Sequence, residues 1–289
     1  MTSEPSPLAH AQEIPVFHRS NSRREYPMPI DIHTHAFHPK IADKVVRQLE
    51  DHYRISPVGN GLLEDLLPRL DRAGIRRAVM HCAATKAEQV VPANNWALHV
   101  KENHPRLIPF GTFHPDFPEW EKEFGRLAAA GIPGIKIHPD FQGFNLDDPR
   151  LEPILEAISG RFLLMVHVGD YLPPEQNPSS PQKLAALLDR FPRLQVIAAH
   201  LGGFQHWAYV VDHLAGRDLY LDTSSSLNAI PSRLLFDIFA HHPRERILFG
   251  SDYPLFDPSA EMKLLQTRMR LGDRELEELL TNGERLFAA

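Results

Sequence analysis

The chain has 289 residues, of which 43% are hydrophobic and 24% are charged, so it can bury a sizeable core and wholesale disorder is excluded. Its formal net charge of −6 argues against a nucleic-acid partner and against a polybasic membrane surface. The single cysteine, Cys82, excludes an intramolecular disulfide. The sequence has no long apolar stretch and no signal-peptide core, which predicts a soluble cytoplasmic protein.

The N-terminal part differs from the remainder of the chain. Residues 1–27 carry several prolines and no sustained periodicity, which predicts a flexible extension. Over residues 28–289, apolar segments typical of buried strands alternate with helical patterns. Their starts lie 25 to 47 residues apart, near the spacing of about 30 for one strand-helix-strand unit. The eight predicted strands are Ile30–His35, Arg77–Cys82, Leu107–Phe113, Gly134–His138, Phe162–Val168, Leu194–His200, Leu219–Thr223 and Ile247–Gly250.

Helical spacing of leucines and glycine stops mark the segments between these strands. Gly74, Gly131 and Gly160 follow three such segments, and glycine suits the left-handed position after a helix. Another helix is predicted over Pro181–Arg190, with proline in its first turn. We expect Asp273 to cap the last helix, whose apolar face comprises Leu276, Leu279, Leu280 and Leu286.

Strands that are apolar on both faces and alternate with helices imply a parallel sheet covered by helices. Eight such units favour an α/β fold of one domain, a closed (β/α)₈ TIM-like barrel over residues 28–289. An open doubly wound sheet is the alternative. No G-x-G-x-x-G turn follows the first strand, which disfavours a dinucleotide-binding version of that sheet.

Polar residues occupy one face of the first predicted strand. Alternation along Ile30–His35 places Asp31, His33 and His35 on the same side. Unpaired polar groups inside a barrel cost about 1–3 kcal/mol each, so a purely structural strand would not carry them. Two imidazoles two residues apart on a rigid strand can instead converge on one cation.

Further polar residues stand at the carboxyl ends of later strands, where barrel enzymes carry their active sites. His167 and His200 lie at the ends of the fifth and sixth segments, Asp252 follows the eighth, and Lys136 and His138 share a face in the fourth. Histidines with one aspartate form a sensible ligand set for Zn²⁺ or a related divalent ion, with a position left for water.

Other polar residues near these strands have less specific expected roles. We expect Asp31 to orient a first-strand histidine and Lys136 to be buried in a pair with an acid. His138 suits a site role and an interior structural role equally well. Ordinary structural positions are favoured for four histidines that follow or end strands, His38, His81, His114 and His206.

Five ordered motifs resemble those of the amidohydrolase superfamily of metal-dependent barrels. The resemblance runs from about Pro29 to the end and is nearest to the amidohydrolase 2 branch, which includes aminocarboxymuconate semialdehyde decarboxylase-like enzymes. The motifs are Ile30-Asp-Ile-His-Thr-His, Ile135-Lys-Ile-His-Pro, Val166-His-Val-Gly, Ala199-His-Leu-Gly-Gly and Phe249-Gly-Ser-Asp-Tyr-Pro.

The resemblance implies roles for individual residues. His33, His35, His167 and Asp252 match metal ligands, and Asp252 also handles protons. His200 matches the histidine that contacts the catalytic water or the substrate in mononuclear members. The fourth strand ends in Lys136-Ile-His138, which favours one ion over the two-ion centre of some relatives, with a carboxylated lysine left open.

Two departures favour hydrolysis over decarboxylation. Decarboxylases of this branch hold a substrate carboxylate with an arginine near the sixth-strand loop, and residues 201–207 contain no arginine. Some aromatic-acid decarboxylases replace the first histidine by glutamate, whereas His33 is retained. The leading hypothesis is therefore a hydrolase of a small amide, lactone or ester that uses a Zn²⁺-activated water, with Asp252 as proton acceptor and His200 orienting water or stabilising an oxyanion.

Two alternatives remain. One is a non-oxidative decarboxylase of an unsaturated or aromatic carboxylate on the same metal site. The other is a silent metal-binding scaffold, which has no chemical need for His200 and Asp252 together. Loop residues expected to contact a small-molecule substrate are His138, Phe141, Gln142, Phe144 and Tyr253, and the resemblance allows a homodimer.

Overall fold

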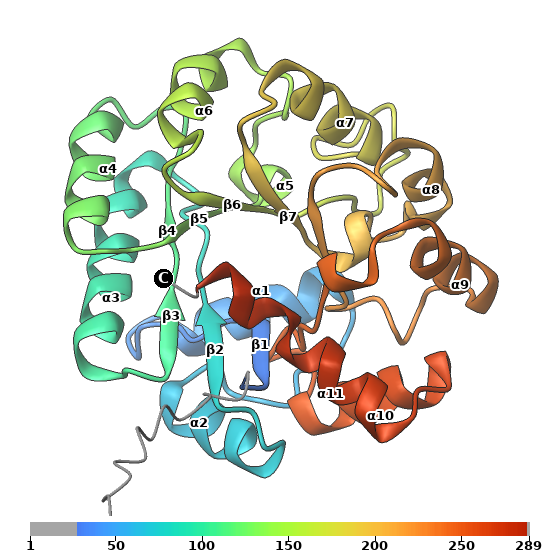
Figure 1. Ribbon diagram of the computed structural model, residues 1–289. Coiled ribbons are helices and arrows are strands. Elements are labelled where there is room, and N and C mark those ends of the chain that lie inside the picture. Colours follow the sequence, from blue (N-terminus) through green and yellow to red (C-terminus); the bar gives the residue numbers. More distant parts are fainter. Residues whose placement is uncertain (1–27, 288–289) are drawn as a thin grey trace, which may run out of the picture.

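The computed structural model describes residues 28–287 as a barrel of parallel strands surrounded by helices, as predicted (Figure 1). The predicted N-terminal extension, residues 1–27, lies outside the described residues. All eight predicted strands are present. They are β1 Ile30–Thr34, β2 Arg77–Met80, β3 Leu107–Pro109 with β4 Gly111–Thr112, β5 Gly134–Ile137, β6 Leu163–Val166, β7 Gln195–Ala198, β8 Tyr220–Asp222 and β9 Ile247–Leu248.

The third predicted strand forms two short pieces that connect two sheets. β3 pairs with β2 in the order β1-β2-β3, and β4 pairs with β5 in the order β4-β5-β6-β7-β8-β9. Hydrogen bonds between the first and last strands close the barrel. The amide of Ile32 donates to the carbonyl of Phe249 at 2.8 Å, and the amide of Asp252 donates to the carbonyl of His33 at 2.8 Å.

Two apolar clusters stabilise the barrel from inside and outside. Strand residues such as Leu164 and Val196 share the larger cluster with the surrounding helices. The smaller cluster lies within the barrel and includes Ile30, Met165 and Ile197. Since apolar side chains fill this part of the interior, the polar residues predicted for a site are confined to the carboxyl ends of the strands.

Helices are present at the five predicted positions, namely before Gly74, Gly131 and Gly160, over Pro181–Arg190 and at the C-terminal end of the described chain. Gly74, Gly131 and Gly160 have positive φ angles of 70°, 69° and 71°, as expected after a helix. The capping prediction for Asp273 is wrong, because Gly272 is the N-cap and Asp273 is the first helical residue. The helices are α1 Ala42–Tyr53, α2 Leu63–Arg72, α3 Val90–Asn103, α4 Trp120–Ala129, α5 Pro139–Gln142, α6 Glu152–Ile158, α7 Pro181–Arg190, α8 Val210–His213, α9 Ser232–His241, α10 Pro258–Met269 and α11 Asp273–Thr281.

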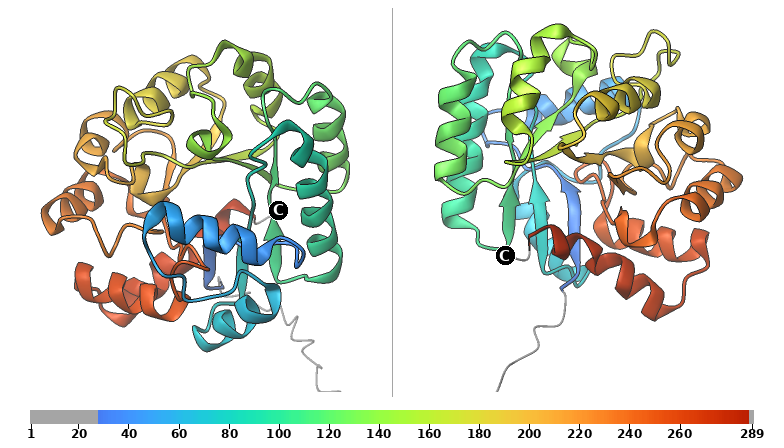
Figure 2. Two further views of the ribbon diagram at one scale, coloured as in Figure 1. Left: turned by 180° about the vertical axis from the view of Figure 1, so that it is seen from behind. Right: turned by 45° about the horizontal axis from the view of Figure 1, so that its top comes forward.

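Helix α1 is set apart from the outer ring of helices. It crosses one end of the barrel, whereas α3, α4, α6 and α7 lie around the outside of the sheet (Figure 2). Over residues 28–287, no helix combines the length and apolar character needed to cross a membrane.

The buried Glu261 on α10 makes the stability of the fold depend on pH. Asn228 donates a 2.8 Å hydrogen bond to it, but burial raises the pKa of Glu261 to about 7. The protonated form is favoured in the folded state, so stability falls as pH rises from about 4.5 to about 7. We expect Glu261→Gln to be about 1–3 kcal/mol more stable than the wild type at pH 8 and nearly equal to it at pH 4.5. Urea unfolding at both pH values tests this, and parallel pH curves for the two proteins would contradict it.

Candidate functional site

A cavity of about 1060 Å³ opens at the carboxyl ends of the strands, where the polar residues gather. Helices α1 and α3 and the neighbouring loops supply much of its apolar lining, including Val45, Leu49 and Trp96. Its polar lining includes residues at, near or beyond strand ends, namely His33, His35, Lys136, His138, His167, His200, Ser225 and Asp252.

His33 presents one nitrogen as a free electron-pair donor. Its Nδ1 donates a 2.9 Å hydrogen bond to Asp222 Oδ2, so the neutral ring leaves Nε2 without a proton. The ring is neutral because burial lowers the pKa of His33 to about 4. Its Nε2 lies 3.4 Å from Asp252 Oδ1. A lone pair therefore faces a carboxylate oxygen.

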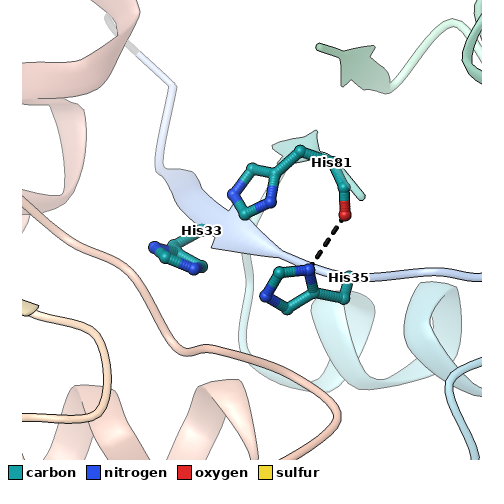
Figure 3. Close-up of side chains that lie close together, drawn as sticks. All are labelled: His33, His35 and His81. Atoms are coloured by element: carbon teal, nitrogen blue, oxygen red, sulfur yellow. Dashed lines mark hydrogen bonds between the residues drawn. The ribbon is translucent and has the colours of Figure 1, made fainter. Parts of the chain in front are cut away.

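His35 is oriented in the same way by a different element. Its Nδ1 donates a 2.9 Å hydrogen bond to the carbonyl of His81, directly after β2 (Figure 3). Its Nε2 lies 3.1 Å from Asp252 Oδ1, the oxygen that also faces His33. Two imidazoles from one strand thus converge on one carboxylate oxygen.

Asp252 occupies the loop after β9 in a left-handed conformation, with φ of 63°. The hydroxyl of Ser225 donates to its Oδ2, which leaves Oδ1 for the two histidines. The nearby imidazoles, His33 first, hold the pKa of Asp252 well below its usual value against the opposing effect of burial. Because left-handed non-glycine residues are strained, the surrounding hydrogen bonds must maintain this position.

The donor set fits a divalent metal ion. Two atoms bound to one ion at about 2.0–2.2 Å lie about 3.0–3.5 Å apart. The separations of 3.4 Å and 3.1 Å between Asp252 Oδ1 and the Nε2 atoms of His33 and His35 fall in this range. An unprotonated nitrogen facing a carboxylate is repulsive unless a cation lies between them, and imidazole with carboxylate suits zinc-like ions.

His167 and His200 adjoin this group. His167 Nδ1 and His200 Nε2 are 2.8 Å apart, and His200 Nδ1 lies 3.1 Å from the carbonyl of Ser224. One ligand atom from each of His33, His200 and Asp252 lies within 4.8 Å of the others. His167 contacts His200, whereas its Nε2 makes no hydrogen bond to a described residue.

The position of His200 does not arise from strand alternation. The predicted partners on its face, Val196 and Ala198, belong to the cluster shared with the helices. β7 ends at Ala198, and His200 has a left-handed φ of 61°. This turn of the backbone, not the regular strand, directs the ring into the site.

Asp222 is the main polar residue of the site that sequence reasoning missed. It ends β8, is fully buried, and receives hydrogen bonds from His33 Nδ1 at 2.9 Å and from the amides of His200 at 3.1 Å and Ser224 at 3.0 Å. Asp31, the predicted orienting group, instead accepts from the amides of His33 and Ser251. Asp222 is thus the acid that fixes the His33 ring.

Residues 30–287 match the family model Amidohydro_2, described as amidohydrolase. The chain belongs to this amidohydrolase family. This confirms the family that the five motifs suggested, over nearly all of the described residues.

Solved structures support the fold of this amidohydrolase. A 5-carboxyvanillate decarboxylase from Sphingomonas paucimobilis is 18% identical with a TM-score of 0.67 and covers 91% of this chain and 99% of its own. A candidate 2-pyrone-4,6-dicarboxylic acid hydrolase from Pseudomonas putida is 18% identical with a TM-score of 0.64, with coverages of 91% and 98%. A manganese complex of 5-carboxyvanillate decarboxylase from Novosphingobium aromaticivorans is 19% identical with a TM-score of 0.65, with coverages of 90% and 96%.

Lys136 lies on β5 in this amidohydrolase and lines the cavity. Its side chain is buried, and its Nζ makes no hydrogen bond to any group in the described part of the chain. Burial lowers the pKa of Lys136 to about 8, while Asp222 and Asp252 oppose that effect from a distance. The predicted direct pair with an acid is therefore wrong.

Two of the five expected substrate contacts line the cavity, His138 and Phe141. Their rings stack with centroids 4.0 Å apart. The other three do not line it. The side chain of Gln142 accepts from the backbone amide of His138 and donates to two backbone carbonyls. Phe144 is buried in the core. The Tyr253 hydroxyl donates to Asp65 at 2.8 Å.

Tyr53, at the end of α1, lines the cavity although its sequence context gave no signal for it. The amide of Phe141 donates to His138 Nδ1 at 3.3 Å, so the proton of the neutral His138 ring is on Nε2. That Nε2 lies 3.1 Å from the Tyr53 hydroxyl and donates to it. The O–H of Tyr53 is then free to donate to another group. Burial raises the pKa of Tyr53 well above its usual value, which keeps this donor neutral.

Proposed function

We propose that this amidohydrolase hydrolyses a small amide, lactone or ester with the help of one divalent metal ion, Zn²⁺. The observation that carries the proposal is the ionised Asp252, with Oδ1 facing two imidazole nitrogens and Oδ2 held by Ser225. His33, His35, His167 and Asp252 would hold the ion. When bound, it supplies Lewis acidity and lowers the pKa of water toward about 7.

Asp252 is proposed to accept the proton of the attacking water and to pass it to the leaving group. Its lowered pKa keeps it ionised, and so ready to accept a proton, at neutral pH. Neutral His200 donates through Nδ1 to the carbonyl of Ser224, so its Nε2 is an acceptor. That Nε2 accepts from His167 Nδ1 at 2.8 Å, so His200 is suited to fixing the His167 ring rather than to donating to an oxyanion.

Tyr53 is proposed to supply the hydrogen bond to the substrate that His200 does not. Its O–H is left free by the donation from His138, and it lies on the cavity wall. A donor placed near developing negative charge lowers the barrier most when water is excluded. The apolar side chains of Leu49, Phe141 and Phe204 on the same wall serve that exclusion.

A non-oxidative decarboxylase is the second candidate. Two observations favour it. The buried, unpaired Lys136 can neutralise a substrate carboxylate, and similar solved structures include decarboxylases of 5-carboxyvanillate and 2,6-dihydroxybenzoate. An apolar wall also favours conversion of a charged carboxylate to neutral CO₂.

Metal removal and product analysis test the proposal together. We expect the chelator-stripped chain to lose at least about 99% of its turnover on a hit from an amide, lactone, ester and carboxylate library, and to regain it with Zn²⁺. Reaction in H₂¹⁸O should place ¹⁸O in the product of a hydrolase. Release of CO₂ with no ¹⁸O in the organic product selects the decarboxylase, and full activity of the stripped chain would contradict metal dependence in both.

A further inference from the structure

His81 follows β2 directly and is fully buried beside the two first-strand histidines. Its ring meets those of His33 and His35 edge to face, with centroid separations of 4.5 Å and 4.6 Å. Figure 3 shows the three rings converging from the ends of β1 and β2. The position expected for His81 from sequence was an ordinary structural one.

The His81 ring has no partner that would explain its burial as structural. Neither Nδ1 nor Nε2 makes a hydrogen bond to any group in residues 28–287. A buried polar atom without a partner costs about 1–3 kcal/mol, and imidazole carries two such atoms. An ion that accepts one nitrogen lone pair would remove part of this cost.

The backbone of His81 already serves the neighbouring ligand. Its carbonyl accepts from His35 Nδ1 at 2.9 Å and so directs His35 Nε2 toward Asp252. One ring nitrogen from each of His33, His35 and His81 lies within 4.8 Å of the others. Ligands of one ion lie up to about 4 Å apart, so the His81 ring lies near enough to His33 and His35 to be a candidate ligand of the same ion.

We propose that His81 is an additional ligand of the divalent ion at the His33–His35–Asp252 centre. The inference rests on the proposed function only in requiring an ion at that centre. With His167, four imidazoles and one carboxylate would then face the ion, and such a set favours ions that prefer nitrogen, such as Zn²⁺ and Co²⁺, over the harder Mn²⁺. The site would then select Zn²⁺, unlike the manganese-loaded decarboxylase of similar fold.

Chelator competition on the purified full-length chain tests this without a substrate. In His81→Ala we expect the Kd for Zn²⁺ to rise about 10–100-fold or more, with a smaller change for Mn²⁺. His242→Ala is the matched control, because His242 is also buried, has an unpaired Nε2 and caps α9 at the opposite end of the barrel. Its Kd for Zn²⁺ should equal that of the wild type. Unchanged Zn²⁺ affinity in a folded His81→Ala chain would overturn the proposal.

A second measurement covers the case in which His81→Ala fails to fold. X-ray absorption of the Zn²⁺-loaded wild type and of His81→Gln counts the bound imidazoles, and we expect one fewer in the variant. An equal count rejects His81 as a ligand. Both readouts are independent of turnover, so an error in the proposed reaction would leave them unchanged. Conversely, failure of the His81 inference would leave the chelator dependence of turnover intact.

Discussion

Replacement of Asp252 by asparagine is expected to lower kcat by about a thousandfold or more on the substrate that the library screen identifies. An amide cannot accept the water proton, and it removes a negative charge from a site where His33 and His35 face Oδ1 at 3.4 Å and 3.1 Å. The loss should appear in kcat rather than in KM alone. A metal-loaded Asp252→Asn chain with wild-type kcat would show that another group transfers the proton.

A matched variant separates this effect from a general disturbance of the same loop. Asp257 caps α10 through hydrogen bonds to the amides of Ser259 and Ala260. Asparagine is an equally good cap, so Asp257→Asn should retain wild-type turnover. Metal content measured on both variants then shows how much of the loss in Asp252→Asn comes from a missing ligand and how much from a missing base.

The barrel and the first-strand histidines were predictable because they depend on local pattern. Continuous apolar runs such as Phe162–Val168 are distinct from leucine-spaced helices, and their regular recurrence left few alternatives to a barrel. The pair His33 and His35 is visible because two residues on a strand share a face. Because these histidines lie at the end of a strand, the sequence also predicted that they face the carboxyl end of the barrel, where barrel enzymes carry their active sites.

The remaining parts of the site depend on contacts that no local pattern encodes. Asp222 meets His33 across 189 positions of sequence, and only closure of the barrel brings them together. Tyr53 and His81 reach the site from the ends of α1 and β2, where periodicity stops. The expected contacts Gln142, Phe144 and Tyr253 lie outside the cavity lining, since residues near a strand end can equally well turn inward to brace a loop or fill the core.

The link between Asp222 and His33 leads to the second large expected effect. In Asp222→Asn the new amide can accept from His33 Nδ1 or from the amides of His200 and Ser224, but its NH₂ group must then face one of these donors. If it faces His33, the imidazole proton moves to Nε2 and the lone pair that would bind the ion is lost. We expect Zn²⁺ affinity to fall about 10–100-fold and the metal-free chain to lose about 2–4 kcal/mol of stability.

The comparison that decides this prediction is with another buried carboxylate, one that does not line the cavity. Glu123 on α4 accepts from Asn94 at 2.8 Å and pairs with Arg126, so Glu123→Gln should lose stability and retain Zn²⁺ affinity. Urea unfolding of the metal-free chains and chelator competition on the folded ones separate the two effects. Wild-type Zn²⁺ affinity in Asp222→Asn would mean that the His33 ring needs no acid to hold its tautomer. Loss of affinity in Asp222→Asn alone would establish that the carboxylate at the end of β8 determines which nitrogen of His33 faces the metal centre.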